Sequence, residues 1–587
     1  MSYFCCSVQT KTTTVPKTKF QLFLLVFFVL LLNQSCRKAT PGTDYQAIKT
    51  VVVDSAAVVS PHPLATRVGI EVLKKGGNAV DAAVAVQFAL AVVYPRAGNI
   101  GGGGFMVIRT KDGEAAALDY REKAPMAAFR DMYLDSLGNV VDGLSTMGHL
   151  AAGVPGTVAG LFEAHRKYGR LRDVKELIQP AIELAEKGFR ISATEAGRLN
   201  GFQESFRKYN EAPNPFLKDS FQMGDLMKQE KLAETLKQIR DKGGAGFYDG
   251  PVAEAIVAEI QSGNGIMTLE DLKSYEAKWR EPVVGQYDDY RIISMPPSSS
   301  GGIALLQMLK MVEPYPLHEY GFHSTRAVHL MAEAERRAYA DRAEHLGDSD
   351  FYDVPRDSML SDAYLRARMA SFDAGHATVS DSILAGNFKL LKESFETTHT
   401  SVVDADGNAV SVTTTLNSNY GCKVWVDGAG FFLNNEMDDF SAKPGVPNQF
   451  GLVGAEANAI QPGKRMLSSM TPTIVEKDGE LFMVLGAPGG STIITAVFQV
   501  FINVAEFGMS LEESVNAGRF HHQWLPDAIL IEDGAFPDST KQALEAMGHH
   551  FNTVGRMAVI KAIVRLPDGR LQGVGDPRNP DDDAGGY

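Results

Sequence analysis

The segment 397–403 has the sequence TTHTSVV and directly follows Glu396. Because β-branched residues fit a pleated surface, this composition favours a β-strand, which would be an ordinary structural interpretation. The segment also begins with a threonine, whose hydroxyl is a poor nucleophile unless a base removes its proton. At a chain N-terminus the threonine's own α-amino group can be that base, because it titrates at about pH 8. A chain that uses Thr397 in this way must first cut itself after Glu396.

The first 36 residues differ in composition from the rest of the chain. They contain no Asp or Glu, and residues 22–32 form an uninterrupted apolar run that follows several lysines. This run is too short to span a bilayer comfortably, so it predicts the core of a signal peptide. The ending at Cys36 resembles a loose bacterial lipobox. We therefore expect an exported protein, periplasmic or anchored in the outer membrane through lipidated Cys36, with an uncleaved signal anchor or simple secretion as alternatives.

Composition limits the partners and the crosslinks. The formal charge of −14, from 57 basic and 71 acidic residues, argues against a polyanion such as nucleic acid. With 44% hydrophobic residues the chain can bury a large core. Cys5 and Cys6 precede the apolar run and Cys36 would be modified, so Cys422 alone would remain and we expect no intrachain disulfide.

Upstream of Thr397, the apolar spacing and the turn residues mainly predict helices. Two helices are expected at 63–75 and 79–93, separated by a Gly-Gly-Asn stop. A hairpin is expected over 107–120, turned at Asp112-Gly113. The region 153–281 is mainly helical in character. A helix over 324–346 would begin at the N-cap Ser324, with its Glu/Arg pairs on a solvated or salt-bridged face.

Downstream of Thr397 the pattern changes to short strands. Asp-Gly pairs at 406–407, 427–428, 478–479 and 568–569 are typical hairpin turns. Repeated hairpins indicate antiparallel sheet. Long helices before and meandering strands after predict an α+β protein with layered sheets and helices outside.

Motifs on both sides of Thr397 match one known family. They are DYRE at 119–122, MPPSSSGG at 295–302, VTTTLN at 412–417, NEMDDF at 435–440, KRMLSSM at 464–470 and APGGS at 487–491. With them the chain resembles the γ-glutamyltranspeptidase (glutathione hydrolase) family of the N-terminal nucleophile superfamily, over roughly residues 51–587. The resemblance implies an αββα four-layer sandwich with one core shared by two subunits. Self-cleavage would leave a large subunit, 37–396, and a small catalytic subunit, 397–587.

The resemblance also implies a role for each motif. Thr397 would be the nucleophile, supported by the Thr415 hydroxyl. Gly489 and Gly490 would offer two backbone amides to the oxyanion, and losing one such donor typically costs about 10² to 10³ in rate. The residues expected to bind substrate are Arg121, Ser468 and Ser469 at its carboxylate, Glu436 and Asp439 at its ammonium group, and Asn417. Arginine suits a carboxylate because its planar guanidinium donates two parallel hydrogen bonds.

One residue differs from the family pattern, and one segment resembles a family loop. Met466 stands where many family members have proline. The segment 439–454 contains two prolines and Phe450, and it resembles the lid loop of lidded members. A lid would exclude water and shape the acceptor site.

Taken alone, several motifs have structural interpretations. Arg121 could form a surface ion pair with Glu122 or Asp119, and the Gly489-Gly490 pair could be a tight turn. The glycine-rich segment 98–104 lacks the Walker lysine and more plausibly lets backbones approach closely. Neighbouring His521 and His522 would point to opposite faces of a strand, so we interpret both as structural. No metal or organic cofactor is expected.

The resemblance thus implies γ-glutamyl hydrolysis and transfer. Thr397 would attack the γ-glutamyl amide of glutathione or a related compound, and water, an amino acid or a dipeptide would resolve the resulting ester. One alternative is a related acylase for glutaryl or cephalosporin-type amides, which would not need Glu436 and Asp439. The other is a non-catalytic surface lipoprotein that keeps the fold but does not mature.

Overall fold

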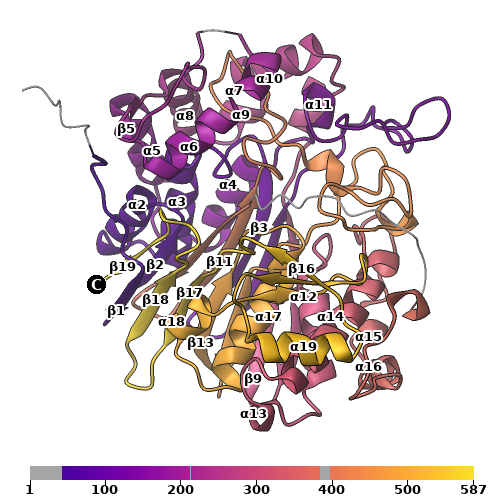
Figure 1. Ribbon diagram of the computed structural model, residues 1–587. Helices are drawn as coiled ribbons and strands as arrows, with labels where there is room; N and C mark the ends of the chain where they lie inside the picture. The colour runs from indigo at the N-terminus through magenta and orange to yellow at the C-terminus, as the bar shows by residue number, and fades with distance from the viewer. Residues whose placement is uncertain (1–41, 212, 384–396) are drawn as a thin grey trace, which may run out of the picture. The chain divides into compact units, whose positions relative to one another are not determined.

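The computed structural model describes residues 42–211, 213–383 and 397–587 (Figure 1). The predicted leader with Cys36, and Glu396 at the expected cut, lie outside the described residues. Within those three ranges, no helix is long and apolar enough to cross a membrane. Cys422 is buried and free.

The first two helices follow from their caps and their apolar content. Helix α2 (Pro63–Lys74) starts at a proline, and the His62 side chain accepts a hydrogen bond from the Leu64 amide. Helix α3 (Ala79–Val93) opens with a capping box between Asn78 and Asp81. Every residue of α3 is buried, as its nearly continuous apolar sequence predicts. Both predicted helices are confirmed.

One of the two large sheets contains the strand that follows Thr397. Its order is β19 (Asp583–Gly586), β2 (Ala57–Ser60), β10 (Thr398–Val403), β11 (Ala409–Thr415), β3 (Gly103–Arg109), β4 (Ala115–Tyr120) and β7 (Lys278–Arg280). All of these neighbours pair antiparallel. The predicted hairpin is confirmed, because β3 and β4 pair across Asp112-Gly113. Strand β10 lies between β2 and β11: the residues directly after Thr397 pair with β11, and residues 401–403 pair with both neighbours.

The other large sheet is also antiparallel throughout. Its order is β1 (Thr50–Val53), β18 (Leu571–Gly575), β17 (Lys561–Arg565), β13 (Glu480–Gly486), β12 (Thr473–Lys477), β9 (Tyr290–Ser294) and β8 (Val283–Tyr287). Three of the four predicted Asp-Gly turns join paired strands: β10 to β11, β12 to β13 and β17 to β18. The turn at Asp427-Gly428 instead lies between Trp425 and Phe432, which form an isolated bridge.

The two sheets pack face to face, and helices cover both outer faces (Figure 1). Helices α2, α3 and α4 (Thr157–Tyr168) pack on the sheet that contains β10. Helices α12 (Gly301–Val312), α17 (Thr492–Ala505) and α18 (Leu511–Asn516) pack on the other sheet. Alternate residues of β3 face opposite ways: Val107 joins the core between the sheets, while Met106 and Ile108 join the core beneath the helices. The predicted αββα sandwich is confirmed.

Both sheets combine strands from the two sides of residue 397. In the sheet with β10, strands β2, β3, β4 and β7 precede that residue, whereas β10, β11 and β19 follow it. In the other sheet, β1, β8 and β9 precede it and the remaining four strands follow it. A cut after Glu396 would therefore divide the chain without dividing the core.

The remaining elements lie around this sandwich. Upstream of the sheet strands β7 to β9 they are η1 (His149–Ala151), α5 (Lys175–Lys187), β5 (Phe189–Arg190), α6 (Ala193–Gly201), α7 (Gln203–Tyr209), β6 (Leu226–Met227), α8 (Glu230–Lys242), α9 (Ala245–Tyr248), α10 (Pro251–Ser262) and α11 (Leu269–Lys273). These confirm the mainly helical character predicted for 153–281. Further along the chain lie α13 (Leu317–Tyr320), α14 (Thr325–His345), α15 (Arg356–Met359), α16 (Asp362–Met369), η2 (Ser380–Ile383), η3 (Glu436–Asp439), η4 (Glu456–Asn458), β14 (Phe520–His521), β15 (Ile529–Glu532), α19 (Asp538–Ala546) and β16 (Phe551–Val554).

Helix α14 is confirmed in position, but its charged residues are not solvated. The Ser324 hydroxyl caps it by accepting a hydrogen bond from the Ala327 amide at 3.2 Å. Its central Glu and Arg residues are buried, because α12 and the segment around η2 cover the helix. Of the two predicted alternatives, the salt-bridged face is correct, since Glu333 pairs with Arg336 and Arg337.

Candidate active site

Thr397 lies directly before β10 and beside the end of β11. The strand register pairs Thr398 with Thr414, which brings Thr397 next to Thr415. Their Oγ1 atoms are 3.4 Å apart. The Thr415 hydroxyl also accepts a hydrogen bond from the Asn417 amide at 2.7 Å. This bond fixes the Thr415 oxygen beside the Thr397 hydroxyl.

Gly489 and Gly490 lie between β13 and α17, on a backbone with φ of +147° and +55°. A Cβ atom on Gly489 would lie 2.6 Å from the Ala558 Cβ atom, so a side chain does not fit there. Among the described residues, neither glycine amide has an acceptor, whereas the Gly489 carbonyl accepts from the Thr492 hydroxyl at 2.7 Å. Both amides lie just before the N-terminus of α17, where the helix dipole favours negative charge.

Arg121 directly follows β4 and is fully buried. Its guanidinium forms ion pairs with Glu436 and Asp439 and lies 3.7 Å from the Glu122 carboxylate. Its Nε donates to the Met466 carbonyl at 3.2 Å. The alternative of a surface ion pair is therefore wrong, because this guanidinium is buried beside the carboxylate of its neighbour Glu122 and two carboxylates of the distant segment η3.

Burial perturbs these acidic groups. It raises the pKa of Glu436 well above its usual value and raises the pKa of Asp439, while the Arg121 charge opposes both shifts. Burial likewise raises the pKa of Glu122 to about 7 against the attraction of Arg121. Glu436 Oε2 and both carboxylate oxygens of Glu122 have no hydrogen-bond partner among the described residues. Because an orphaned buried oxygen is costly, this cluster would gain from a bound cationic group.

The serine pair is held by the predicted loop 295–302. The Ser468 amide donates to the Ser298 carbonyl at 3.0 Å, and the Ser300 amide donates to the Ser468 carbonyl at 2.8 Å. The Ser469 hydroxyl accepts a hydrogen bond from Arg342 Nη2 at 3.2 Å. Both serines are therefore fixed by neighbours from the part of the chain upstream of Thr397.

One small cavity, of about 20 Å³, brings nearly all of these residues together. Its lining comprises Arg121, Arg342, Thr397, Thr415, Asn417, Glu436, Asp439, Phe450, Leu452, Ser468, Ser469, Met470, Gly490 and Ile493. Of the predicted catalytic and substrate-binding residues, only Gly489 is not in the lining, and it precedes Gly490. The volume suffices for about one water molecule.

A second cavity, of about 760 Å³, lies next to the first. Three pairs of adjacent residues form what we call the wall, because one member of each pair lines each cavity: Asn417 and Ser418, Asp439 and Asp438, and Phe450 and Gln449. The wall is hydrogen-bonded, since the Ser418 hydroxyl donates to Gln449 Oε1 at 2.8 Å and the Gln449 amide donates to Asp438 at 3.1 Å. Burial raises the pKa of Asp438 to about 6.

Four residues of the small cavity were not predicted: Arg342, Leu452, Met470 and Ile493, which lies in the first turn of α17. Leu452 lies in the predicted lid segment, and Met470 ends the motif that contains Ser468 and Ser469. Arg342 had no local signal, because its helix carries many Glu and Arg residues and nothing in its spacing separates this one from the others.

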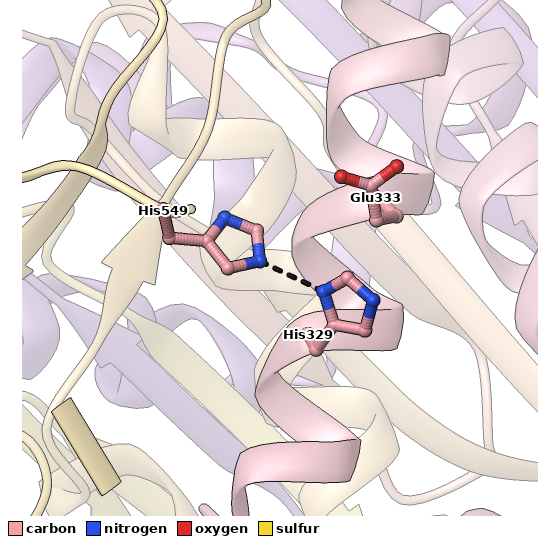
Figure 2. Close-up of side chains that lie close together, drawn as sticks. All are labelled: His329, Glu333 and His549. Atoms are coloured by element: carbon pink, nitrogen blue, oxygen red, sulfur yellow. Dashed lines mark hydrogen bonds between the residues drawn. The ribbon is translucent and has the colours of Figure 1, made fainter. Parts of the chain in front are cut away.

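Among the described residues, His329, Glu333 and His549 form a group with the composition of a metal site (Figure 2). His329 Nε2 lies 2.8 Å from the Asp373 carbonyl, so it donates there, and its Nδ1 accepts from His549 Nε2 at 2.8 Å. Glu333 accepts hydrogen bonds from Arg337 and from the Thr378 amide. Because these donors occupy the carboxylate and a neighbouring guanidinium opposes a cation, the group fits a hydrogen-bonded anchor better than a metal site.

The histidine pair 521–522 and the glycine-rich segment 98–104 both take part in packing and hydrogen bonding. His521 and His522 have different neighbours: the His521 ring bonds the Thr495 hydroxyl at 2.8 Å, and the His522 ring accepts from the Trp524 amide at 3.0 Å. In the glycine-rich segment, a Cβ atom on Gly101 would lie 2.2 Å from the Phe432 carbonyl oxygen. These glycines permit close backbone approach, as predicted.

Comparisons with known proteins agree with this geometry. The family model of gamma-glutamyltranspeptidase matches residues 65–586. The glutathione hydrolase proenzyme of Escherichia coli K12 is 46% identical, over 96% of this chain and 98% of that protein. A cephalosporin acylase structure from Bacillus halodurans has a TM-score of 0.78 at 25% identity, covering 94% of this chain and 99% of its own. The Helicobacter pylori gamma-glutamyltranspeptidase structure has a TM-score of 0.53 at 48% identity, covering 57% of this chain and 96% of its own.

Proposed function

Because the chain belongs to the γ-glutamyltranspeptidase family of enzymes, we propose that it hydrolyses and transfers the γ-glutamyl group of glutathione and related compounds, with Thr397 as the nucleophile. The supporting observation is the composition of one cavity. It joins a threonine hydroxyl to an arginine, two carboxylates and two serines, which complement the α-carboxylate and α-ammonium groups of a glutamyl unit.

Substrate binding would replace the ion pairs within the protein by ion pairs between the protein and the substrate. Arg121 now contacts Glu436 and Asp439, so the protein's own carboxylates occupy the place of a substrate carboxylate. A zwitterionic glutamyl unit would give its carboxylate to Arg121, Ser468 and Ser469. Its ammonium group would bind Glu436 and Asp439, and it would satisfy the orphaned Glu436 Oε2.

The reaction would need only groups of this chain and water. Once the bond before Thr397 is cut, its α-amino group takes the hydroxyl proton as Oγ1 attacks the γ-carbonyl carbon. The amides of Gly489 and Gly490 stabilise the oxyanion. The C–N bond then breaks, the amine leaves with the transferred proton, and a γ-glutamyl ester remains on Thr397. Water resolves this ester to glutamate, and an amino acid or dipeptide amine resolves it to a new γ-glutamyl amide.

The amine side of the reaction would use the large neighbouring cavity. Its volume of about 760 Å³ leaves room for a dipeptide-sized leaving group or acceptor, whereas the small cavity has no such room. Opening of the wall around Phe450 and Gln449 would join the two cavities. The predicted lid segment is therefore the part of the chain that we propose to move during turnover.

The proposal also includes maturation and export. We propose self-cleavage between Glu396 and Thr397, export by the leader 1–36, and lipid attachment at Cys36. The proposed subunits are 37–396 and 397–587, held together by the two shared sheets.

The test compares γ-L-glutamyl-p-nitroanilide with glutaryl-p-nitroanilide, which lacks the α-amino group. We expect the parent enzyme to prefer the glutamyl substrate. An Asp439→Asn variant should lose about 10- to 100-fold in kcat/KM for that substrate, as expected when an ammonium group loses a charged partner, and should lose much less for the glutaryl substrate. Preferred cleavage of the glutaryl substrate, unaffected by the variant, would instead establish the acylase. Absence of turnover with an uncut chain would favour the non-catalytic alternative.

A further inference from the structure

Arg342 is a buried cation in the substrate cavity that forms no ion pair with any of the described acidic side chains, although the charge of Asp439 attracts it. Only 5% of its surface is exposed. Its Nε donates to the Ser300 hydroxyl at 3.0 Å, and its Nη2 donates to the Ser469 hydroxyl at 3.2 Å. Within the described ranges, no carboxylate forms an ion pair with it, in contrast to Arg336 and Arg337 on the same helix. Because a buried charge without a partner is costly, this placement calls for an explanation.

The hydrogen bonds of Arg342 reach both serines of the predicted carboxylate site. The contact with Ser469 is direct. The contact with Ser468 passes through Ser300, whose hydroxyl donates to the Ser468 carbonyl at 2.6 Å while its oxygen accepts from Arg342. One guanidinium therefore fixes both members of the pair.

The contact with Arg342 also determines whether the Ser469 hydroxyl donates or accepts a hydrogen bond in the cavity. Its oxygen accepts a hydrogen bond from a donor that has no acceptor capacity, since arginine only donates. The hydroxyl proton is thus left to donate toward the cavity, where a carboxylate would accept it.

The charge of Arg342 has a second effect. The other cation in the cavity lining, Arg121, is already surrounded by Glu122, Glu436 and Asp439. A substrate carboxylate that enters this acidic cluster would meet repulsion unless another positive charge offsets it. Arg342 is the further cation in the lining that can supply this charge.

We propose that Arg342 is a positioning residue that orients Ser468 and Ser469 as donors and selects substrates that carry an α-carboxylate. The inference rests on the proposed function, and it adds a determinant of the substrate class to that site.

The experiment compares the parent with Arg342→Gln, Arg342→Lys and Arg326→Gln. Arg326 lies on the same helix but is exposed, so its variant is the matched control. Each protein is assayed with γ-L-glutamyl-p-nitroanilide for KM and kcat, and with glutarate and 4-aminobutyrate as competing ligands. Glutarate keeps the carboxylate that Arg342 would serve, whereas 4-aminobutyrate lacks the α-carboxylate of a glutamyl group. Intact mass establishes that each variant has matured.

For Arg342→Gln we expect KM to rise about 10- to 100-fold, as for the loss of a charge-assisted contact, with a much smaller change in kcat. The inhibition constant of glutarate should rise in parallel, and that of 4-aminobutyrate should stay close to the parent's. Arg342→Lys keeps the charge but not the planar fork, so it should recover part of the loss. Arg326→Gln should match the parent.

Two results would overturn the proposal. Equal weakening of glutarate and 4-aminobutyrate, or a fall in kcat at unchanged KM, would mean that Arg342 only supports the fold. If Arg342→Gln does not mature, the same comparison is made with Arg342→Lys. A Ser300→Ala variant tests the link to Ser468 separately, and a parent-like KM and inhibition pattern in that variant would also refute the positioning role. A parent that does not cleave the glutamyl anilide at all would refute the proposed function itself, a result distinct from either of these.

Discussion

At the scale of single residues, the site is a set of opposed charges held out of water. Arg121 contacts the acidic side chains Glu436 and Asp439, and burial raises the pKa of both carboxyl groups. Burying these charges costs free energy, and a zwitterionic ligand that pairs with them would offset part of that cost. Glu122 is the residue in this cluster whose contribution to stability is easiest to isolate, because neither of its carboxylate oxygens has a hydrogen-bond partner among the described residues.

Replacing Glu122 by glutamine should therefore stabilise the protein at high pH. Burial raises the pKa of Glu122 from 4.5 to about 7. Below about pH 4.5 the group is protonated in both states, and it costs nothing. Between pH 4.5 and 7 Glu122 ionises in the unfolded state but stays protonated in the folded state, which favours unfolding. By pH 8 the parent should therefore have lost roughly 3 kcal/mol of its unfolding free energy, and the Glu122→Gln variant should not show this loss. Urea denaturation at pH 4.5 and pH 8 measures the unfolding free energies of parent and variant. If the variant exceeds the parent by the same amount at both pH values, the prediction is contradicted.

At the scale of elements, α14 connects the candidate site to the described residues around Thr378, upstream of the expected cut. Its Arg342 lies at the cavity, whereas Glu333 and Arg337 hold Thr378 and its neighbours. Arg336 adds an ion pair to Asp527, on the far side of residue 397 in the sequence. The buried charges of this helix thus connect the small cavity to both proposed subunits.

Loss of the Glu333 carboxylate should weaken this connection strongly. Burial alone would raise its pKa, but the charges of Arg336 and Arg337 hold it at about 2. A Glu333→Gln variant leaves two buried guanidinium groups without their shared partner, which should cost about 3–5 kcal/mol of unfolding free energy at pH 7.

Because the carboxylate's pKa is depressed, its contribution is complete above about pH 4.5 and fades as the pH falls toward 2. The difference in unfolding free energy between the parent and Glu333→Gln, measured by urea denaturation, should therefore decrease as the pH falls over that range. Glu344→Gln, an exposed position on the same helix, serves as the control and should lie within about 0.5 kcal/mol of the parent. A Glu333 variant as stable as this control would contradict the account.

At the scale of the whole molecule, the sequence predicts those features that depend on local pattern or on a family motif. The capping box at Asn78 and three of the four Asp-Gly turns identify their elements correctly. The motifs bring Thr397, Arg121 and the serine pair to one cavity as expected. The role of each of these residues in catalysis stays a prediction.

Other features depend on contacts between distant segments, which a single sequence does not reveal. The burial of α14 requires α12 and the segment around η2 to cover it, so its arginines were expected at a solvated or salt-bridged face rather than in the cavity. Arg342 became recognisable only when Ser300 and Ser469, 42 and 127 residues away, were placed beside it. The large second cavity likewise forms where the predicted lid segment meets residues 140–147, Phe202 and residues 418–423, and those three other parts of the chain carry no pattern that indicates a binding site.

We infer above all that folding prepares Thr397 to become an N-terminal nucleophile. The most direct measurement is the intact mass of the purified protein before and after incubation, beside a Thr397→Ala variant, with turnover of a γ-glutamyl anilide recorded on the same samples. We predict that the parent alone yields two fragments that separate between Glu396 and Thr397, and that turnover grows with the fragments. A folded parent that stays one chain and is inactive, or a Thr397→Ala variant that is cut and active like the parent, would contradict the account.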